Sequence, residues 1–74
     1  METFIYFLYD RIANKPRAVG NNRRKLGVIA TRLTQAADPS EPKCVRIGGM
    51  ALPRFCVLTT HNNPDVDVSG LVIV

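Results

Sequence analysis

The sequence predicts an α+β fold in which one or two N-terminal helices pack on a small antiparallel sheet. In the first half, apolar residues recur at the three- and four-residue spacing of a helix face. The second half consists of short β-branched runs separated by Gly and Asn-Pro turn signals. Because 74 residues leave room for one core, residues 1–74 are expected to form a single domain. The alternative is a small all-β barrel, if both helical segments are strands.

The first segment, residues 2–13, is compatible with two structures. Four apolar residues have the spacing of one helical face: Ile5, Leu8, Tyr9 and Ile12. A helix is therefore predicted, with Asn14-Lys15-Pro16 as its stop. A strand over residues 3–9 competes with it, because aromatic and β-branched side chains are concentrated there.

A second helix is predicted after a loop over residues 16–22, where Gly20-Asn21-Asn22 is a turn signal. Its apolar residues have helical spacing: Leu26, Ile29, Ala30, Leu33 and Ala37. Asn22 is the expected N-cap, and the helix should end before Asp38-Pro39. A strand is the alternative for this segment, because Gly27 weakens a helix and Val28-Ile29 is β-branched. Residues 39–42 are expected to be an extended linker, because each of its two prolines disfavours the α conformation in the residue before it.

Three strands are predicted in the second half, over residues 43–47, 54–60 and 66–74. A hairpin of residues 43–58, symmetric about Met50, would place Cys44 opposite Cys56 and Arg46 opposite Arg54. A slip of one residue would separate both pairs, and Pro53 favours an irregular turn. The two cysteines would then form a disulfide or a redox switch, or remain inert thiols.

The positive charge is concentrated in one stretch of the chain. The net charge is +4, and the residues from Arg11 to Ala37 include seven cations and no anion. Arginine outnumbers lysine, and its planar guanidinium binds two phosphate oxygens at once. A solvated face without a ligand is the alternative interpretation of such a run. The predicted nucleic-acid-binding residues are Arg11, Lys15, Arg17, Arg23, Arg24, Lys25, Arg32, Arg46 and Arg54.

Catalytic and metal-binding motifs are not evident. Residues 63–70 alternate oxygen side chains as a calcium loop does, but Val68 stands where such a loop needs Gly. Cys44, Cys56 and His61 lack the close spacing of a zinc site. We expect no cofactor, no metal and no enzymatic activity.

The sequence therefore predicts a small basic protein that binds the phosphates of RNA or DNA. The alternative is a protein-interaction or regulatory module, such as a compact accessory protein of a virus or phage, that forms a homodimer or binds a protein partner through its apolar segments and C-terminal strand. Glu2 and the short apolar run argue against a secretory signal and membrane insertion. With only two cysteines, an intracellular location, cytoplasmic or nuclear, is expected.

Overall fold

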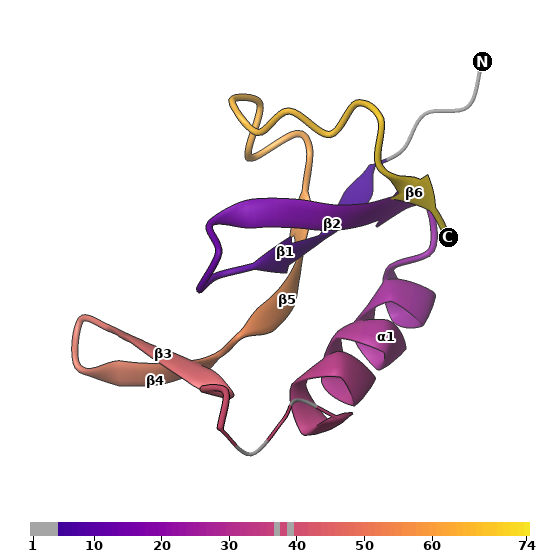
Figure 1. The fold of residues 1–74 in the computed structure, drawn as a ribbon. Coiled ribbons are helices and arrows are strands. Elements are labelled where there is room, and N and C mark those ends of the chain that lie inside the picture. The colour runs from indigo at the N-terminus through magenta and orange to yellow at the C-terminus, as the bar shows by residue number, and fades with distance from the viewer. Residues whose placement is uncertain (1–4, 37, 39) are drawn as a thin grey trace.

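The part of the chain that the structure describes forms a four-stranded sheet with one helix packed on it and a separate two-stranded hairpin (Figure 1). The computed structural model describes residues 5–36, 38 and 40–74. The elements are β1 (Tyr6–Asp10), β2 (Lys15–Gly20), α1 (Arg23–Ala36), β3 (Cys44–Ile47), β4 (Met50–Pro53), β5 (Phe55–Thr59) and β6 (Val72–Ile73). The sheet has the order β5-β1-β2-β6, and β3 and β4 form the hairpin. This is an α+β arrangement, as predicted.

The first segment is a strand, so the predicted N-terminal helix is wrong. β1 lies between β2 and β5, and its consecutive residues Phe7 and Leu8 are both buried. A central strand covered on both faces needs apolar residues on both sides, and such a run can resemble helical spacing. The competing strand is confirmed from Tyr6 onward, whereas residues 3 and 4 of that prediction lie outside the described residues.

The loop predicted over residues 16–22 is also largely wrong, because β2 extends to Gly20 and pairs antiparallel with β1. Pro16 has no backbone N–H to give to a regular ladder. It lies opposite Tyr9, at the irregularity that separates the Leu8 and Tyr9 pairings. The turn signal itself is correct, since the strand ends at Gly20 and the helix begins three residues later.

The second predicted helix is confirmed as α1. The Asn22 side-chain oxygen accepts a hydrogen bond from the backbone N–H of Lys25 (3.1 Å), which is the expected N-cap. Leu26 and Ala30 are buried against the sheet. Residues 23–36 are thus helical, and the sheet ends in two open edges, β5 and β6, so the all-β barrel alternative is wrong. In the described part of the chain, no helix has the length and apolarity to cross a membrane.

The core has two sides. On the helix side, Leu8 and Ala18 pack with Leu26 and Ala30 of α1. The opposite side of the sheet includes Phe7, which meets the Tyr9 ring edge-on at 6.1 Å between centroids. The segment after β5 returns across this part of the molecule to reach β6 (Figure 1). The sheet is therefore covered by different chain segments on its two faces.

The C-terminal strand joins the sheet as a parallel partner of β2. The sheet is mixed rather than purely antiparallel, which corrects the prediction, and β6 is much shorter than the predicted strand over residues 66–74. Gly20 permits this approach, because a Cβ there would lie 2.5 Å from the Val74 backbone oxygen. The predicted strand over residues 54–60 corresponds to β5.

The hairpin of residues 44–53, hereafter the arm, has a different register from the predicted one. Its turn residues Gly48 and Gly49 both have positive φ (58° and 81°), as a two-residue hairpin turn requires. The resulting register pairs Ile47 with Met50, Arg46 with Ala51, and Cys44 with Pro53. The predicted pairing of Arg46 with Arg54 and of Cys44 with Cys56 is therefore wrong. Cys56 lies opposite Tyr9 in β1.

Candidate nucleic-acid interface

Two of the predicted arginines converge on Asp10 at the end of β1. The Asp10 side chain has no exposed surface. Arg54 donates to it with two nitrogens, from Nε to Oδ1 and from Nη2 to Oδ2, each at 3.2 Å. Arg17 Nη2 donates to Oδ2 at 3.1 Å. One buried carboxylate thus neutralises part of the charge that the sequence places in the basic stretch.

Asp10 also closes the turn between β1 and β2. Its Oδ1 accepts hydrogen bonds from the backbone N–H groups of Ile12 (3.0 Å) and Ala13 (3.2 Å). Burial by itself would raise the pKa of this carboxyl group, but the hydrogen bonds from Arg54, Ala13, Arg17 and Ile12 outweigh burial and lower the pKa to about 2. Asp10 is therefore ionised at neutral pH and acts as an acceptor only.

Arg54 connects the arm and the linker to the sheet. Its Nη1 donates to Glu41 Oε2 (2.9 Å), and its backbone N–H donates to the Lys43 carbonyl (2.9 Å). The guanidinium lies 5.1 Å from the Phe55 ring centroid. Arg11 adds a contact from Nη1 to the Pro53 carbonyl (2.6 Å). The guanidinium groups of Arg11 and Arg54 are thus engaged within the protein.

The cations of α1 have a different environment. At 100° per residue, Arg24, Lys25 and Arg32 lie on one outward stripe of the helix with Val28 between them. All four are exposed. We call Arg24, Lys25 and Arg32 the helix cation face. None of the acidic side chains in the described residues forms an ion pair with it. These charges are available to an external anion.

Arg23, which precedes Arg24 in the sequence and lies outside this face, belongs to the first turn of α1, which has no acidic residue. The N-terminus of a helix is the positive end of its dipole, so each cation placed there costs about 0.3–1 kcal/mol. Arg23, Arg24 and Lys25 therefore weaken the helix in the absence of an anion. A bound phosphate would relieve this repulsion.

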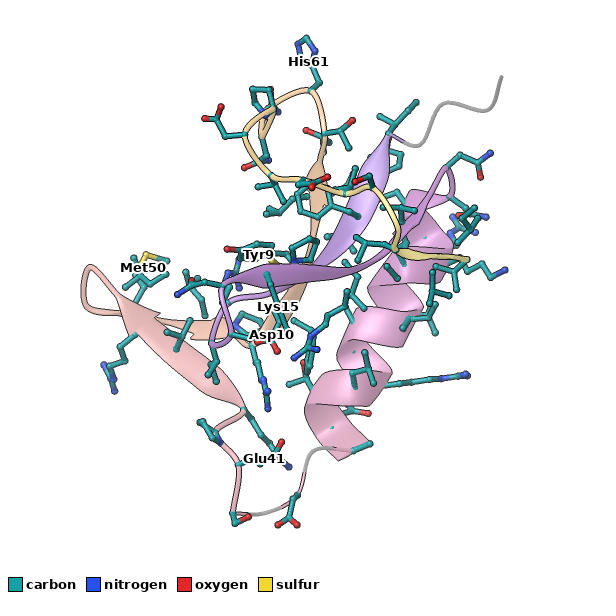
Figure 2. The ribbon with its side chains drawn as sticks, turned by 45° about the horizontal axis from the view of Figure 1, so that its top comes forward. Tyr9, Asp10, Lys15, Glu41, Met50 and His61 are labelled. Atoms are coloured by element: carbon teal, nitrogen blue, oxygen red, sulfur yellow. The ribbon has the colours of Figure 1, made fainter. Side chains whose placement is uncertain are left out.

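The remaining predicted residues lie away from α1. Lys15 begins β2, where it is exposed and opposite Asp10 in the strand register (Figure 2). Arg46 is exposed on the arm, which projects away from the helix (Figure 1). The structure thus brings Arg24, Lys25 and Arg32 together on one face of α1, and places Arg23 about 100° around the helix from Arg24. Lys15 and Arg46 lie elsewhere on the surface.

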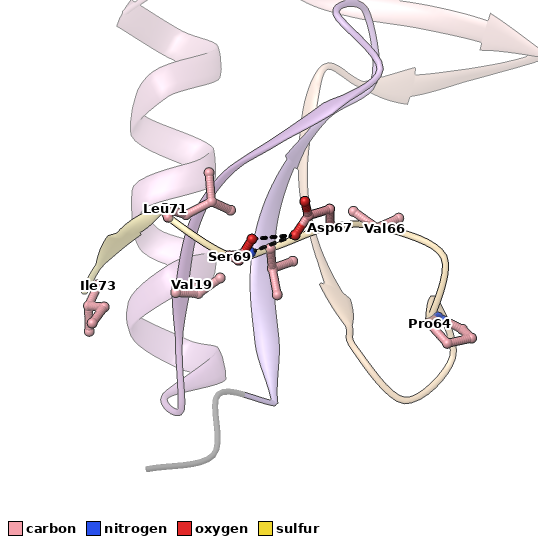
Figure 3. Close-up of a pocket in the computed structure, with 9 residues that line it drawn as sticks. Val19, Pro64, Val66, Asp67, Ser69, Leu71 and Ile73 are labelled. Atoms are coloured by element: carbon pink, nitrogen blue, oxygen red, sulfur yellow. Dashed lines mark hydrogen bonds between the residues drawn. The ribbon is translucent and has the colours of Figure 1, made fainter. Parts of the chain in front are cut away.

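The calcium-like segment forms part of a separate hollow of about 490 Å³ between residues 64–73 and β2 (Figure 3). Asp67 Oδ1 accepts hydrogen bonds from both the backbone N–H (3.0 Å) and the hydroxyl (2.6 Å) of Ser69. The carboxylate therefore shapes its own turn. In the described ranges, no cluster of His, Cys, Asp and Glu is placed to hold a metal ion. His61 lies in an exposed loop (Figure 2).

The two cysteines are separate free thiols. Cys44 is exposed on the arm, and Cys56 is half-buried in β5. Burial raises the pKa of the Cys56 thiol, and the positive charge of Arg11 opposes this rise without cancelling it. Cys56 is thus less readily ionised than an ordinary cysteine, which does not favour a reactive thiolate.

Two features of this region are not predicted from the sequence. One is the role of Asp10, for which the only local signal is the pattern from Asp10 to Asn14. Asp is favoured at the start of a turn, and Asn14 tolerates the positive φ of 55° that it adopts here. The other is the apolar surface of the arm, which depends on a hairpin register different from the predicted one.

Comparison with known proteins identifies no relative of this chain. No protein-family model, curated protein or solved structure matches the chain. The functional assignment depends on the side chains described above.

Proposed function

We propose that this protein binds the phosphate backbone of RNA or DNA through the helix cation face, with little sequence preference and without catalytic activity. The observation that supports the proposal is the contrast between two groups of cations. Arg17 and Arg54 are paired with Asp10, whereas Arg24, Lys25 and Arg32 share an exposed stripe without ion pairs to the described acids. The free thiols suit an intracellular, reducing location.

The chemistry of the helix cation face suits phosphate. Two of its three residues are arginines, whose planar fork binds phosphate oxygens in pairs. Phosphate contacts position a protein on nucleic acid but carry no sequence information. Lys15 and Arg46, which lie elsewhere on the surface, would add attraction at longer range.

Binding across a salt series tests this proposal. The chain is titrated against one labelled mixed-sequence RNA and the DNA of the same sequence, at several salt concentrations. Because bound cations displace condensed counterions, affinity should fall linearly on a logarithmic scale as salt rises. No binding at low salt, or an affinity that is insensitive to salt, would contradict phosphate contact.

The arm favours a second candidate function, docking to a protein partner. Its register places Val45, Ile47, Met50 and Leu52 on one face. Ile47 and Met50 at the tip are 54% and 63% exposed. A two-stranded hairpin is marginal in water by itself, so a partner that covers this face would stabilise it. The short edge strand β6, with Val72 and Ile73 exposed, offers another site for a homodimer or partner.

Sedimentation and pull-down measurements distinguish the two candidates. Ile47→Ser combined with Met50→Ser should abolish dimerisation or partner capture and leave salt-dependent nucleic-acid binding unchanged if both functions exist. Deletion of residues 71–74 tests the β6 edge in the same assay. If the unmodified protein is a monomer and captures no partner, protein docking is excluded.

A further inference from the structure

The helix cation face surrounds a shallow apolar hollow. The hollow has a volume of about 440 Å³ and is lined by Asn22, Arg24, Lys25, Val28, Ile29 and Arg32. Val28 is 45% exposed, and Ile29, half-buried, packs against the core from the other side. The floor is therefore apolar, and the rim is cationic.

The spacing of these residues follows from the helix. Arg24, Val28 and Arg32 are four residues apart, so each step along the axis is about 6 Å. The two arginines thus bracket the apolar floor at about 12 Å from one another along the axis. Lys25, on the same stripe, adds a third cation beside Val28. An occupant of this hollow meets positive charge on both sides of an apolar centre.

Phosphate alone makes no use of the floor. A duplex presents its phosphates outward and keeps the faces of its bases stacked inside. The apolar floor would therefore remain exposed to solvent beneath a duplex. An unpaired nucleotide offers both an apolar surface for the floor and negative charge for the rim, because the flat face of its base is exposed and its phosphates flank the base. Arginine guanidinium groups also stack on bases.

We propose that the hollow takes an unpaired nucleotide of single-stranded RNA or DNA, with the base against Val28 and Ile29 and the flanking phosphates on Arg24, Lys25 and Arg32. This inference rests on the proposed phosphate binding and makes it specific for single strands. An apolar protein side chain suits the hollow less well, since it would leave three cations without counter-charge unless the partner were acidic.

Three labelled oligonucleotides of the same length test the inference by fluorescence anisotropy at one low salt concentration. They are a single strand, the same strand in a duplex, and an abasic single strand with the same phosphates. The intact strand should bind more tightly than the abasic strand by on the order of fivefold, the effect of about 1 kcal/mol from burial of apolar surface between the base and the aliphatic floor. It should also bind more tightly than the duplex.

Val28→Ser locates the base. Serine and valine have similar helix propensities, so the helix should persist, and circular dichroism checks this. Because Val28 is the more exposed of the two apolar residues, the variant should lose most of the preference for the intact strand. The control Ile12→Ser removes an exposed apolar side chain of the β1–β2 turn that does not line the hollow, and should retain the preference for the intact strand.

The outcomes separate this inference from the proposed function. Equal binding of the intact and abasic strands, with salt dependence, overturns the base site and leaves phosphate binding standing. A preference that Val28→Ser leaves undiminished overturns the location. Failure to bind any of the three oligonucleotides overturns both, and binding of polyglutamate in their place would assign the face to an acidic protein partner.

Discussion

Asp10 determines which of the basic residues hold the fold together. Its buried carboxylate accepts hydrogen bonds from Arg17, from two nitrogens of Arg54 and from two backbone N–H groups of the β1–β2 turn. Arg54 extends the connection to Glu41. One acidic residue thus connects the central strand, the linker and the base of the arm.

Removal of this carboxylate should destabilise the protein strongly. Asp10→Ala leaves Arg54, whose side chain is only 15% exposed, without its main counter-charge, and breaking a buried pair in this way costs on the order of 3 kcal/mol. Small domains have roughly 3–5 kcal/mol in total, so urea unfolding should show a variant that has lost most of its stability. Asp10→Asn, which keeps one oxygen acceptor, should lose less of the free energy of unfolding than Asp10→Ala.

The control for this measurement is Asp65→Ala, which removes a carboxylate from an exposed loop. Its effect on the free energy of unfolding should stay within about 0.5 kcal/mol. If Asp10→Ala costs no more than Asp65→Ala, Asp10 does not have the structural role described.

The same residue predicts a loss of stability in acid. The pKa of Asp10 is about 2 in the folded protein, below its ordinary value of 3.8. A group with a lowered folded pKa contributes its full stabilisation above its unfolded pKa and loses it as the pH falls toward the folded one. The urea concentration at the unfolding midpoint should therefore decrease as the pH is lowered from about 4 to about 2.

Asp10→Asn should flatten this pH dependence but not remove it. Hydrogen bonds from Ser40 and Ser69 also lower the pKa of Asp38 and Asp67, and these exposed groups add a smaller effect in the same direction. A wild-type pH profile as flat as that of Asp10→Asn would refute the assignment.

At the scale of single residues, the sequence identifies the cations but not their partners. The count of seven basic and no acidic residues between Arg11 and Ala37 is correct. It does not show that Asp10, one position before that stretch, neutralises Arg17 within it and Arg54 far outside it. Such pairing depends on strand register, which one sequence does not specify.

Among the elements, α1 is the one that local sequence determines best. Its N-cap and apolar stripe are local signals, and both are observed. The helix prediction for β1 is wrong because Phe7 and Leu8 are buried on opposite faces of a central strand, which removes the alternation that marks a strand. The predicted arm register is wrong for another reason, since two adjacent glycines place the centre of the turn between residues 48 and 49 and not at Met50.

Gly27 offers a test of α1 that leaves its surface chemistry intact. A Cβ at this position would meet no heavy atom within 4 Å. Gly27→Ala should therefore raise the free energy of unfolding by about 0.5–1 kcal/mol, because alanine loses less backbone entropy in a helix. Urea unfolding measures this change.

Nucleic-acid binding should be unaffected by Gly27→Ala, since Gly27 does not line the hollow. Gly49→Ala is the contrasting variant. Its φ of 81° suits glycine, so alanine there should destabilise the arm. A loss of stability in Gly27→Ala would contradict the helix as described.

At the scale of the whole molecule, basic residues with different roles occupy different places. Arg11, Arg17 and Arg54 make contacts within the fold. The helix cation face lies on the outside of α1, and Arg46 belongs to β3 of the arm, which projects away from the helix (Figure 1). The α+β class is predictable because helix caps and β-branched runs are local. The parallel β6 and the separate arm depend on contacts between distant segments, which no local pattern reports.

The central claim is that the helix cation face contacts phosphate, and the salt dependence of binding tests it most directly. Two triple variants remove the same charge from the net +4. One changes Arg24, Lys25 and Arg32 to alanine, and the other changes Lys15, Lys43 and Arg46 to alanine.

The first variant should weaken single-strand binding. It should also reduce the slope of log affinity against log salt by about three, roughly one for each cation that binds a phosphate. The second should change this slope by less than about one. Equal reductions of affinity and slope in the two variants would show that net charge alone attracts the nucleic acid, and would contradict a site on α1.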